Sequence, residues 1–110
     1  MKKEDWIWMP HPGHFIGANN CKFRLNTYVG GYIVSTVGEY FPVGAEEMMD
    51  LGFDRKYETM VFEAQPNNEK EWQCCPYQID VGEERDIKGY NHRNDAVRGH
   101  YQLCGKWSEE

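Results

Sequence analysis

The pattern of apolar and polar positions predicts three β-strands. In CKFRLNTYV, Cys21 to Val29, apolar and polar residues alternate, as they do in a strand that buries one face. YIVSTVGEY, Tyr32 to Tyr40, and YETMVFEA, Tyr57 to Ala64, are rich in β-branched and aromatic residues. Gly30-Gly31 between the first two runs is a two-residue hairpin signal, because both glycines can adopt positive φ. We therefore expect a three-stranded antiparallel sheet.

Helical periodicity is clearest near the C-terminal end. A helix is predicted from about Asn91 to Trp107, with Asn91 or Asn94 as its N-cap. Gly99 within it costs about 1 kcal/mol relative to Ala and permits close approach by another backbone. The face that this helix would bury contains Val97, His100, Leu103, Cys104 and Trp107.

Two further segments carry weaker patterns. GAEEMMDLG, Gly44 to Gly52, is predicted as a short helix, with acidic residues in its first turn and Gly52 as its C-terminal stop. Residues 1–20 are expected to form an irregular arm, interrupted by Pro10 and Pro12. Apolar burial of Trp6, Trp8 and Phe15 would hold this arm to the rest of the domain.

The length of 110 residues fits one domain, residues 1–110, with a small hydrophobic core. The predicted fold class is therefore a small α+β domain, in which a three-stranded antiparallel sheet packs against a C-terminal helix. A bound metal would add stability to a core of this size.

The charge balance restricts the partners of the chain. Twelve basic and 18 acidic residues give a net charge of −6, which argues against nonspecific binding to duplex nucleic acid. The sequence contains neither a run of about 20 apolar residues nor a signal-peptide pattern, so we expect a cytoplasmic protein with no membrane partner. Because disulfides rarely persist in that compartment, the four cysteines are interpreted as metal ligands or buried thiols.

A zinc site is one hypothesis for the C-terminal helix. His100 and Cys104 are four residues apart and therefore share a helix face, where an imidazole nitrogen and a thiolate can bind one ion. The remaining ligands would be Cys75 and Cys74, with Cys21 as an alternative fourth ligand. Adjacent cysteines in an extended chain point apart, which disfavours joint use of Cys74 and Cys75. The alternative interpretation is that His100 and Cys104 are core residues.

The motif HPGH, His11 to His14, is a second candidate. Two histidines separated by a Pro-Gly turn could bind a metal or act as acid and base in catalysis. The alternative is an ordinary surface loop. A thiolate–imidazolium pair of His100 and Cys104 is also conceivable, although the sequence indicates no orienting group or oxyanion site for it.

Several stretches resemble short hypothetical proteins of bacteriophages and prophages. They are MPHPGHFI (Met9 to Ile16), YVGGYIVSTVGEYFP (Tyr28 to Pro42), DRKYETMVFEA (Asp54 to Ala64) and GYN followed by AVRGHYQLCGKW within Gly89 to Trp107. The resemblance implies a phage or mobile-element origin and no particular substrate. This chain differs by a shorter segment between the second and third stretches, and by Gly17 where relatives often carry cysteine.

These observations lead to one leading expectation and two alternatives. The leading one is a small, zinc-stabilised, non-enzymatic phage accessory protein that binds a host or phage macromolecule, with Trp6 and Trp8 as candidate contact residues. The first alternative is a metal-dependent hydrolase that acts on nucleotides or nucleic acid through His11 and His14. The second is a metal-free acidic inhibitor of a host defence protein.

Overall fold

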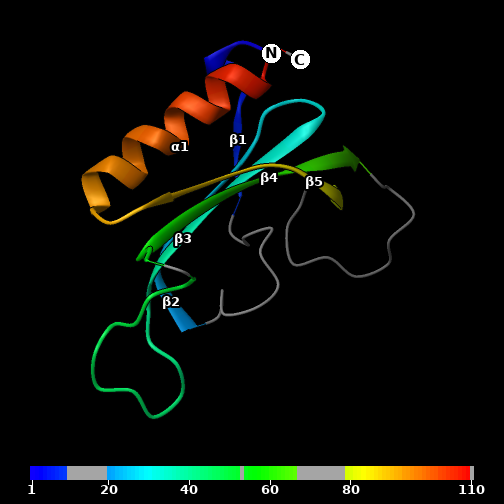
Figure 1. Ribbon diagram of the computed structural model, residues 1–110. Coiled ribbons are helices and arrows are strands. Elements are labelled where there is room, and N and C mark those ends of the chain that lie inside the picture. The colour runs from blue at the N-terminus through cyan, green and yellow to red at the C-terminus, as the bar shows by residue number, and fades with distance from the viewer. Residues whose placement is uncertain (10–19, 53, 67–78, 110) are drawn as a thin grey trace.

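The computed structural model describes residues 1–9, 20–52, 54–66 and 79–109. One antiparallel sheet carries a C-terminal helix on one face (Figure 1). Its five strands follow one another in chain order, and each neighbouring pair is antiparallel. The elements are η1 (Lys3–Asp5, a 3-10 helix), β1 (Ile7–Trp8), β2 (Cys21–Tyr28), β3 (Tyr32–Tyr40), β4 (Tyr57–Pro66), β5 (Ile79–Tyr90) and α1 (Arg93–Trp107).

The predicted α+β class and antiparallel sheet are confirmed, but the predicted number of three strands is wrong. The two additional strands, β1 and β5, lie at the ends of the strand order. Strand β1 has two residues, too few for any periodicity. At the start of β5 the sequence alternates as in a short strand, with Ile79 and Val81 in line with Tyr77, but the charged residues and glycines that follow hide the rest of the strand. The predicted irregular arm is also wrong over residues 1–9, which contain η1 and β1.

The hairpin between β2 and β3 forms as predicted. Tyr28 pairs with Ile33, and the backbone N–H of Val29 donates to the carbonyl of Tyr32 at 2.9 Å. Gly30 adopts a φ of 101°, so the turn has positive φ at its first central residue, as in a type II′ hairpin.

The short helix predicted over Gly44 to Gly52 is not present. The chain forms turns and bends there, and Met49 donates its N–H to the carbonyl of Tyr40 at 2.8 Å. Gly44 has a φ of 85°, which no right-handed helix contains. Val43 is 94% exposed and Met49 is 52% exposed, so this segment buries too little apolar surface to offset the cost of helix nucleation.

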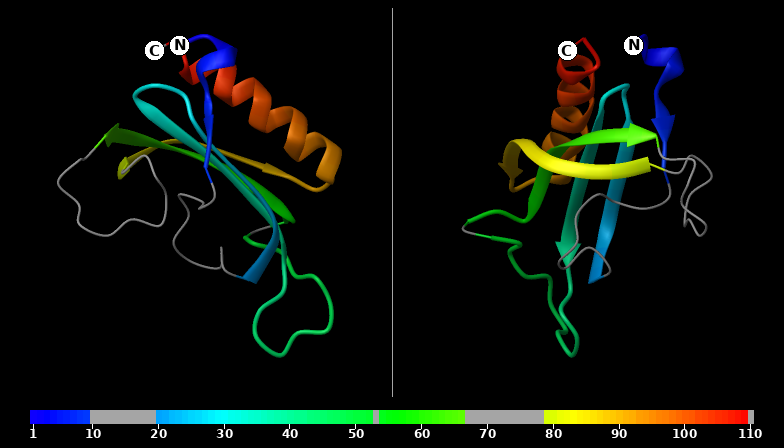
Figure 2. Two further views of the ribbon diagram at one scale, coloured as in Figure 1. Left: turned by 180° about the vertical axis from the view of Figure 1, so that it is seen from behind. Right: turned by 90° about the vertical axis from the view of Figure 1, so that its right-hand side faces the viewer.

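The helix α1 packs across one face of the sheet, mainly over β3 and β4 (Figure 2). The buried face of α1 includes most of the predicted positions. The core between helix and sheet consists of Val29, Val34, Val61 and Cys104, with Trp6, Tyr32, Leu103 and Trp107 packed around them. The predicted N-caps are wrong, because His92 occupies the N-cap position and makes no side-chain capping bond. The first helical residue, Arg93, instead forms an ion pair with Glu39 at 2.5 Å.

The opposite face of the sheet has a smaller apolar cluster. Ile33 and Ala64 are buried there, with Met9, Tyr28 and Val81 packed against them. Six consecutive residues of β3, Ile33 to Gly38, are buried, so this central strand is covered on both faces. The predicted contact of Phe15 with the domain lies outside the described residues.

Candidate functional site

The largest fully buried polar side chain in the described part of the chain is that of His100. Helix α1 places it, fully buried, over the middle of the sheet. Its Nε2 shares a hydrogen bond of 2.8 Å with Oγ1 of Thr27 on β2, and its Nδ1 shares one of 2.6 Å with Oγ1 of Thr36 on β3. Thr36 also shares a 2.6 Å hydrogen bond with Thr59 on β4. One histidine thus links the helix to three strands through three threonine hydroxyls.

This environment favours the neutral imidazole. Burial lowers the pKa of His100 from 6.5 to about 4, because removal from water penalises the charged form. A neutral imidazole donates from one nitrogen and accepts at the other, and threonine hydroxyls can serve both roles. The buried polar group is therefore fully hydrogen-bonded without an ionic partner.

Cys104 lies one helical turn after His100 on the same buried face, as predicted from the spacing. It is fully buried among Val29, Val34 and Val61. Burial raises the pKa of its thiol to about 12, and the neighbouring Thr27 hydroxyl opposes this shift only in part. Near neutral pH the thiol is protonated, and it behaves as a small apolar core residue.

The remaining predicted ligands are not brought to this pair within the described residues. Cys21 is buried at the start of β2, where it packs against Val37, Tyr40 and Leu51 in a separate cluster. Cys74, Cys75, His11 and His14 lie outside the described residues.

The described residues do not by themselves provide a zinc site. Both ring nitrogens of His100 already have threonine partners, whereas a metal-bound imidazole needs one nitrogen lone pair free. Residues 1–9, 20–52, 54–66 and 79–109 contain no group of three or more His, Cys, Asp or Glu side chains placed to hold one metal ion. Zinc therefore stays a prediction that depends on Cys74 and Cys75.

His100 and Cys104 are also unsuited to catalysis in this conformation. Neither side chain is exposed to solvent, so a substrate cannot reach it. A thiolate–imidazolium pair requires a lowered thiol pKa, whereas burial raises the pKa of Cys104 and lowers that of His100.

An exposed aromatic pair lies next to the buried histidine. Trp8 on β1 is 45% exposed and Tyr101 on α1 is 40% exposed, and their ring centroids are 5.5 Å apart. The ammonium group of Lys3 lies 5.1 Å from the centroid of the Tyr101 ring. We call Lys3, Trp8 and Tyr101 the aromatic patch. Trp6, the other predicted contact residue, packs against the core.

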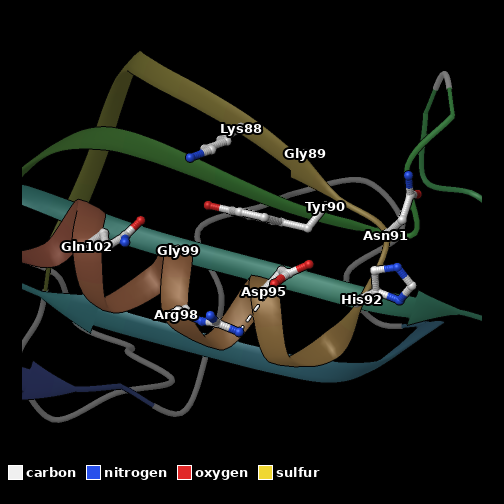
Figure 3. A pocket seen from close by; sticks show the side chains of 9 residues that line it. All are labelled: Lys88, Gly89, Tyr90, Asn91, His92, Asp95, Arg98, Gly99 and Gln102. Carbon is white, nitrogen blue, oxygen red and sulfur yellow. Dashed lines mark hydrogen bonds and ion pairs between the residues drawn. The ribbon is translucent and has the colours of Figure 1, made fainter.

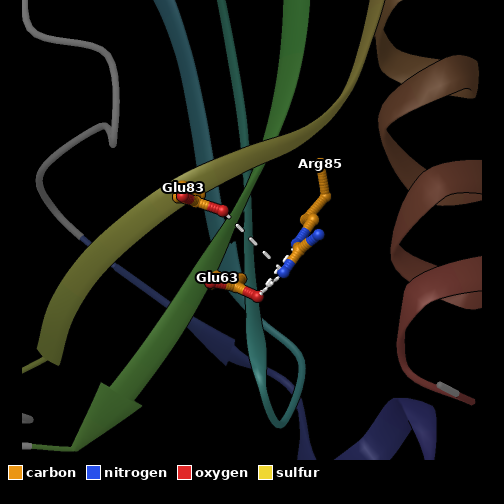
Figure 4. A network of polar contacts seen from close by, with 3 residues as sticks. All are labelled: Glu63, Glu83 and Arg85. Carbon is orange, nitrogen blue, oxygen red and sulfur yellow. Dashed lines mark hydrogen bonds and ion pairs between the residues drawn. The ribbon is translucent and has the colours of Figure 1, made fainter.

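A second polar cluster lies on the exposed, twisted part of β4 and β5. Arg85 forms an ion pair with Glu63 on the neighbouring strand and a longer one, at 4.0 Å, with Glu83 (Figure 4). Glu83 and Glu84 are exposed to solvent, whereas Asp86 is half-buried and accepts a hydrogen bond from Trp107 Nε1 at 3.1 Å. Such surface charges reduce unwanted pairing at a sheet edge.

The described helices include none that is long and apolar enough to cross a membrane. Comparisons with protein-family models, with curated proteins and with solved structures return no match for this chain.

Two parts of this site are not apparent from the sequence. Thr27, Thr36 and Thr59 lie in predicted strands, and nothing in a single strand shows that a threonine faces a histidine of a distant helix. Tyr101 was missed because it lies outside the buried stripe of α1, although an exposed aromatic residue beside that stripe is itself a signal for a contact surface.

Proposed function

We propose that this protein is a small non-enzymatic accessory protein of a phage or prophage, and that it acts by binding a host or phage protein. The observation that carries the proposal is the aromatic patch. Tryptophan and tyrosine are enriched among residues that contribute most of the binding energy at protein interfaces. The resemblance to phage and prophage proteins supports the proposed origin.

The construction of the patch favours binding. Trp8 and Tyr101 come from β1 and α1, which are held together by the sheet and the core, so their rings are presented on regular elements. Trp8 also packs against the His100 ring, with centroids 5.5 Å apart, which restricts its motion. Aromatic side chains that are already restrained lose less conformational entropy on binding.

The proposal is tested by affinity capture from host cells that carry the phage or prophage, comparing the unchanged chain with Trp8→Ala/Tyr101→Ala. We expect that the unchanged chain captures a partner protein and that the double variant does not. The matched control is Ile87→Ala on β5, which removes another large apolar side chain that is 45% exposed. Circular dichroism establishes that each variant is folded.

Two results would contradict this proposal. One is equal capture by the unchanged chain and the double variant, which would show that the patch makes no contact with the partner. The other is loss of capture with Ile87→Ala alone, which would place the interface on β5.

A second candidate is the metal-free acidic inhibitor of a host defence protein. The acidic loop, residues 44–54, joins β3 to β4 and carries Glu46, Glu47, Asp50 and Asp54, all exposed. Met49 within it is 52% exposed, so an apolar contact is available beside the charges. This loop suits a basic partner surface.

The two candidates are separated by Glu46→Lys/Glu47→Lys, which changes the acidic loop and leaves the aromatic patch intact. Loss of capture with this variant, together with steep weakening by salt, supports the inhibitor. If the partner is still captured by the Glu46→Lys/Glu47→Lys variant and in high salt, the acidic inhibitor is excluded.

A further inference from the structure

A groove separates the edge strand β5 from the first half of α1 (Figure 3). It encloses about 500 Å³, which is within the range of sites for small organic molecules. One wall is the end of β5 with Lys88, and the other is α1 with Arg98 and Gln102. Asn91 and His92 close the end where strand and helix connect.

Tyr90 crosses this groove from the strand to the helix. Its hydroxyl packs against Gly99, where a Cβ atom would overlap the phenol. The ammonium group of Lys88 lies 5.7 Å from the centroid of the Tyr90 ring. Burial raises the pKa of the Tyr90 hydroxyl, and the side chain of Thr59 on β4 opposes this shift through a hydrogen bond. The groove therefore contains an aromatic ring with a cation directly beside it.

The polar groups of the groove are mainly hydrogen-bond donors. Lys88 and Arg98 carry two positive charges on opposite walls, and Asn91 and Gln102 add amide groups. Asp95 is the single carboxylate among the lining residues, and it lies 3.4 Å from Arg98. This local excess of positive charge contrasts with the net charge of −6 of the whole chain.

The ion pair between Asp95 and Arg98 does not prevent Arg98 from binding a ligand. Their side chains are 52% and 70% exposed, and exposed pairs of this kind contribute at most about 1 kcal/mol. The guanidinium has further N–H groups, which bind carboxylate and phosphate oxygens in pairs.

We propose that this groove binds a small organic anion, a carboxylate or a phosphate monoester, whose charged oxygens lie between Lys88 and Arg98. The apolar part of the ligand contacts the Tyr90 ring. This site is separate from the aromatic patch, so the proposal is independent of the proposed function.

The test is a titration followed by ¹H–¹⁵N NMR of the full chain with phenyl phosphate, benzoate and benzyl alcohol. The amide signals of Gly89 and Gly99 report on the groove, and that of Gly31 in the β2–β3 turn reports on a distant position. We expect saturable shifts at Gly89 and Gly99 with one or both anions, and none with the neutral alcohol. Saturation by phenyl phosphate alone identifies a phosphate site, and saturation by benzoate alone identifies a carboxylate site.

Variants show whether the two cations hold the anion. Lys88→Gln and Arg98→Gln are each expected to weaken binding by about tenfold, the loss typical of one charged hydrogen bond. Arg24→Gln is the matched control, because Arg24 is an exposed cation on β2 outside the groove. The proposal is overturned by shifts that sodium chloride reproduces at equal ionic strength, by the absence of saturable shifts, or by unchanged affinity in both groove variants.

Discussion

At the scale of single residues, His100 is a titratable group that is fully buried. A buried imidazole costs free energy unless both nitrogens find partners, and here Thr27 and Thr36 supply them. Among the described residues, these two threonine hydroxyls are the partners of the imidazole, and zinc ligation by His100 and Cys104 stays a prediction.

We predict that the protein loses stability as the pH falls from 6.5 towards 4. The pKa of His100 is about 4 in the folded chain and 6.5 as an unperturbed group, so acid protonates the unfolded chain first. The contribution is fully present above pH 6.5, and complete loss amounts to about 3 kcal/mol. Urea unfolding at a series of pH values measures the change.

Two variants identify the group responsible. His100→Gln is expected to be less stable at every pH but to lack the additional loss between pH 6.5 and 4. His92→Gln removes an exposed histidine and should keep the pH dependence of the unchanged chain. If His100→Gln keeps the same slope, the loss comes from another group.

A second prediction concerns metal removal. Because both nitrogens of His100 are hydrogen-bonded and the Cys104 thiol is protonated, we expect EDTA to leave the melting temperature unchanged. The measurement is thermal unfolding with and without EDTA, alongside elemental analysis of protein purified without a histidine tag. About one zinc per chain, with a large drop in melting temperature, would instead show that the metal displaces the threonines.

At the scale of elements, the packing of α1 depends on a residue with no side chain. Gly99 is buried in the middle of the helix, and the Tyr90 hydroxyl occupies the position that a Cβ atom would take. The sequence predicted close approach of another backbone at Gly99, but the approaching group is the side chain of Tyr90 on the preceding strand. Glycine in a helix lowers stability relative to alanine. Here the missing side chain leaves the space in which Tyr90 of β5 packs against α1.

Two glycines of the same helix should therefore respond in opposite directions to alanine. Gly99→Ala is expected to destabilise the protein, because the new methyl group overlaps Tyr90. Gly105→Ala is expected to stabilise it by up to about 1 kcal/mol, because a Cβ atom there meets nothing within 4 Å. Urea unfolding of both variants decides this, and a stabilising Gly99→Ala would show that Tyr90 moves aside freely.

At the scale of the whole molecule, burial is concentrated around the central strand. Strand β3 pairs with β2 and β4 and is buried on both faces, whereas β1 and β5 lie at the two ends of the described strand order. Because opening β3 requires separation of two strand pairs and the helix, its amides need the largest unfolding event to exchange.

We predict that amide hydrogen exchange is slowest in β3. Strand β1 has two residues and should exchange early, as should the outer part of β5. Exchange followed by NMR at neutral pH gives the order residue by residue. Amides of β5 that exchange as slowly as those of β3 would show that this strand is covered by another part of the chain or by a second molecule.

Four elements of this protein could be predicted from the sequence. The apolar spacing of β2 and α1 indicates one buried face, whereas the β-branched and aromatic residues of β3 and β4 indicate strands, and β3 proves to be buried on both faces. The Gly30-Gly31 turn follows from local backbone preference alone. The helical spacing also predicted that His100 and Cys104 share a buried face. The helix expected over Gly44 to Gly52 failed because its acidic first turn and terminal glycine are local signals without an apolar face to bury.

Tertiary structure alone decided the edge strands and the partners of His100. Strands β1 and β5 depend on the hydrogen bonds of a neighbouring strand. Strand β1 is too short for a pattern, and in β5 only the first residues alternate, with Val81 packed against Ile33 and Ala64. Thr27, Thr36 and Thr59 are far apart in the chain and meet only because antiparallel register aligns three strands under one turn of α1. A sequence specifies which side chains are buried through local periodicity, whereas their partners depend on register between distant segments.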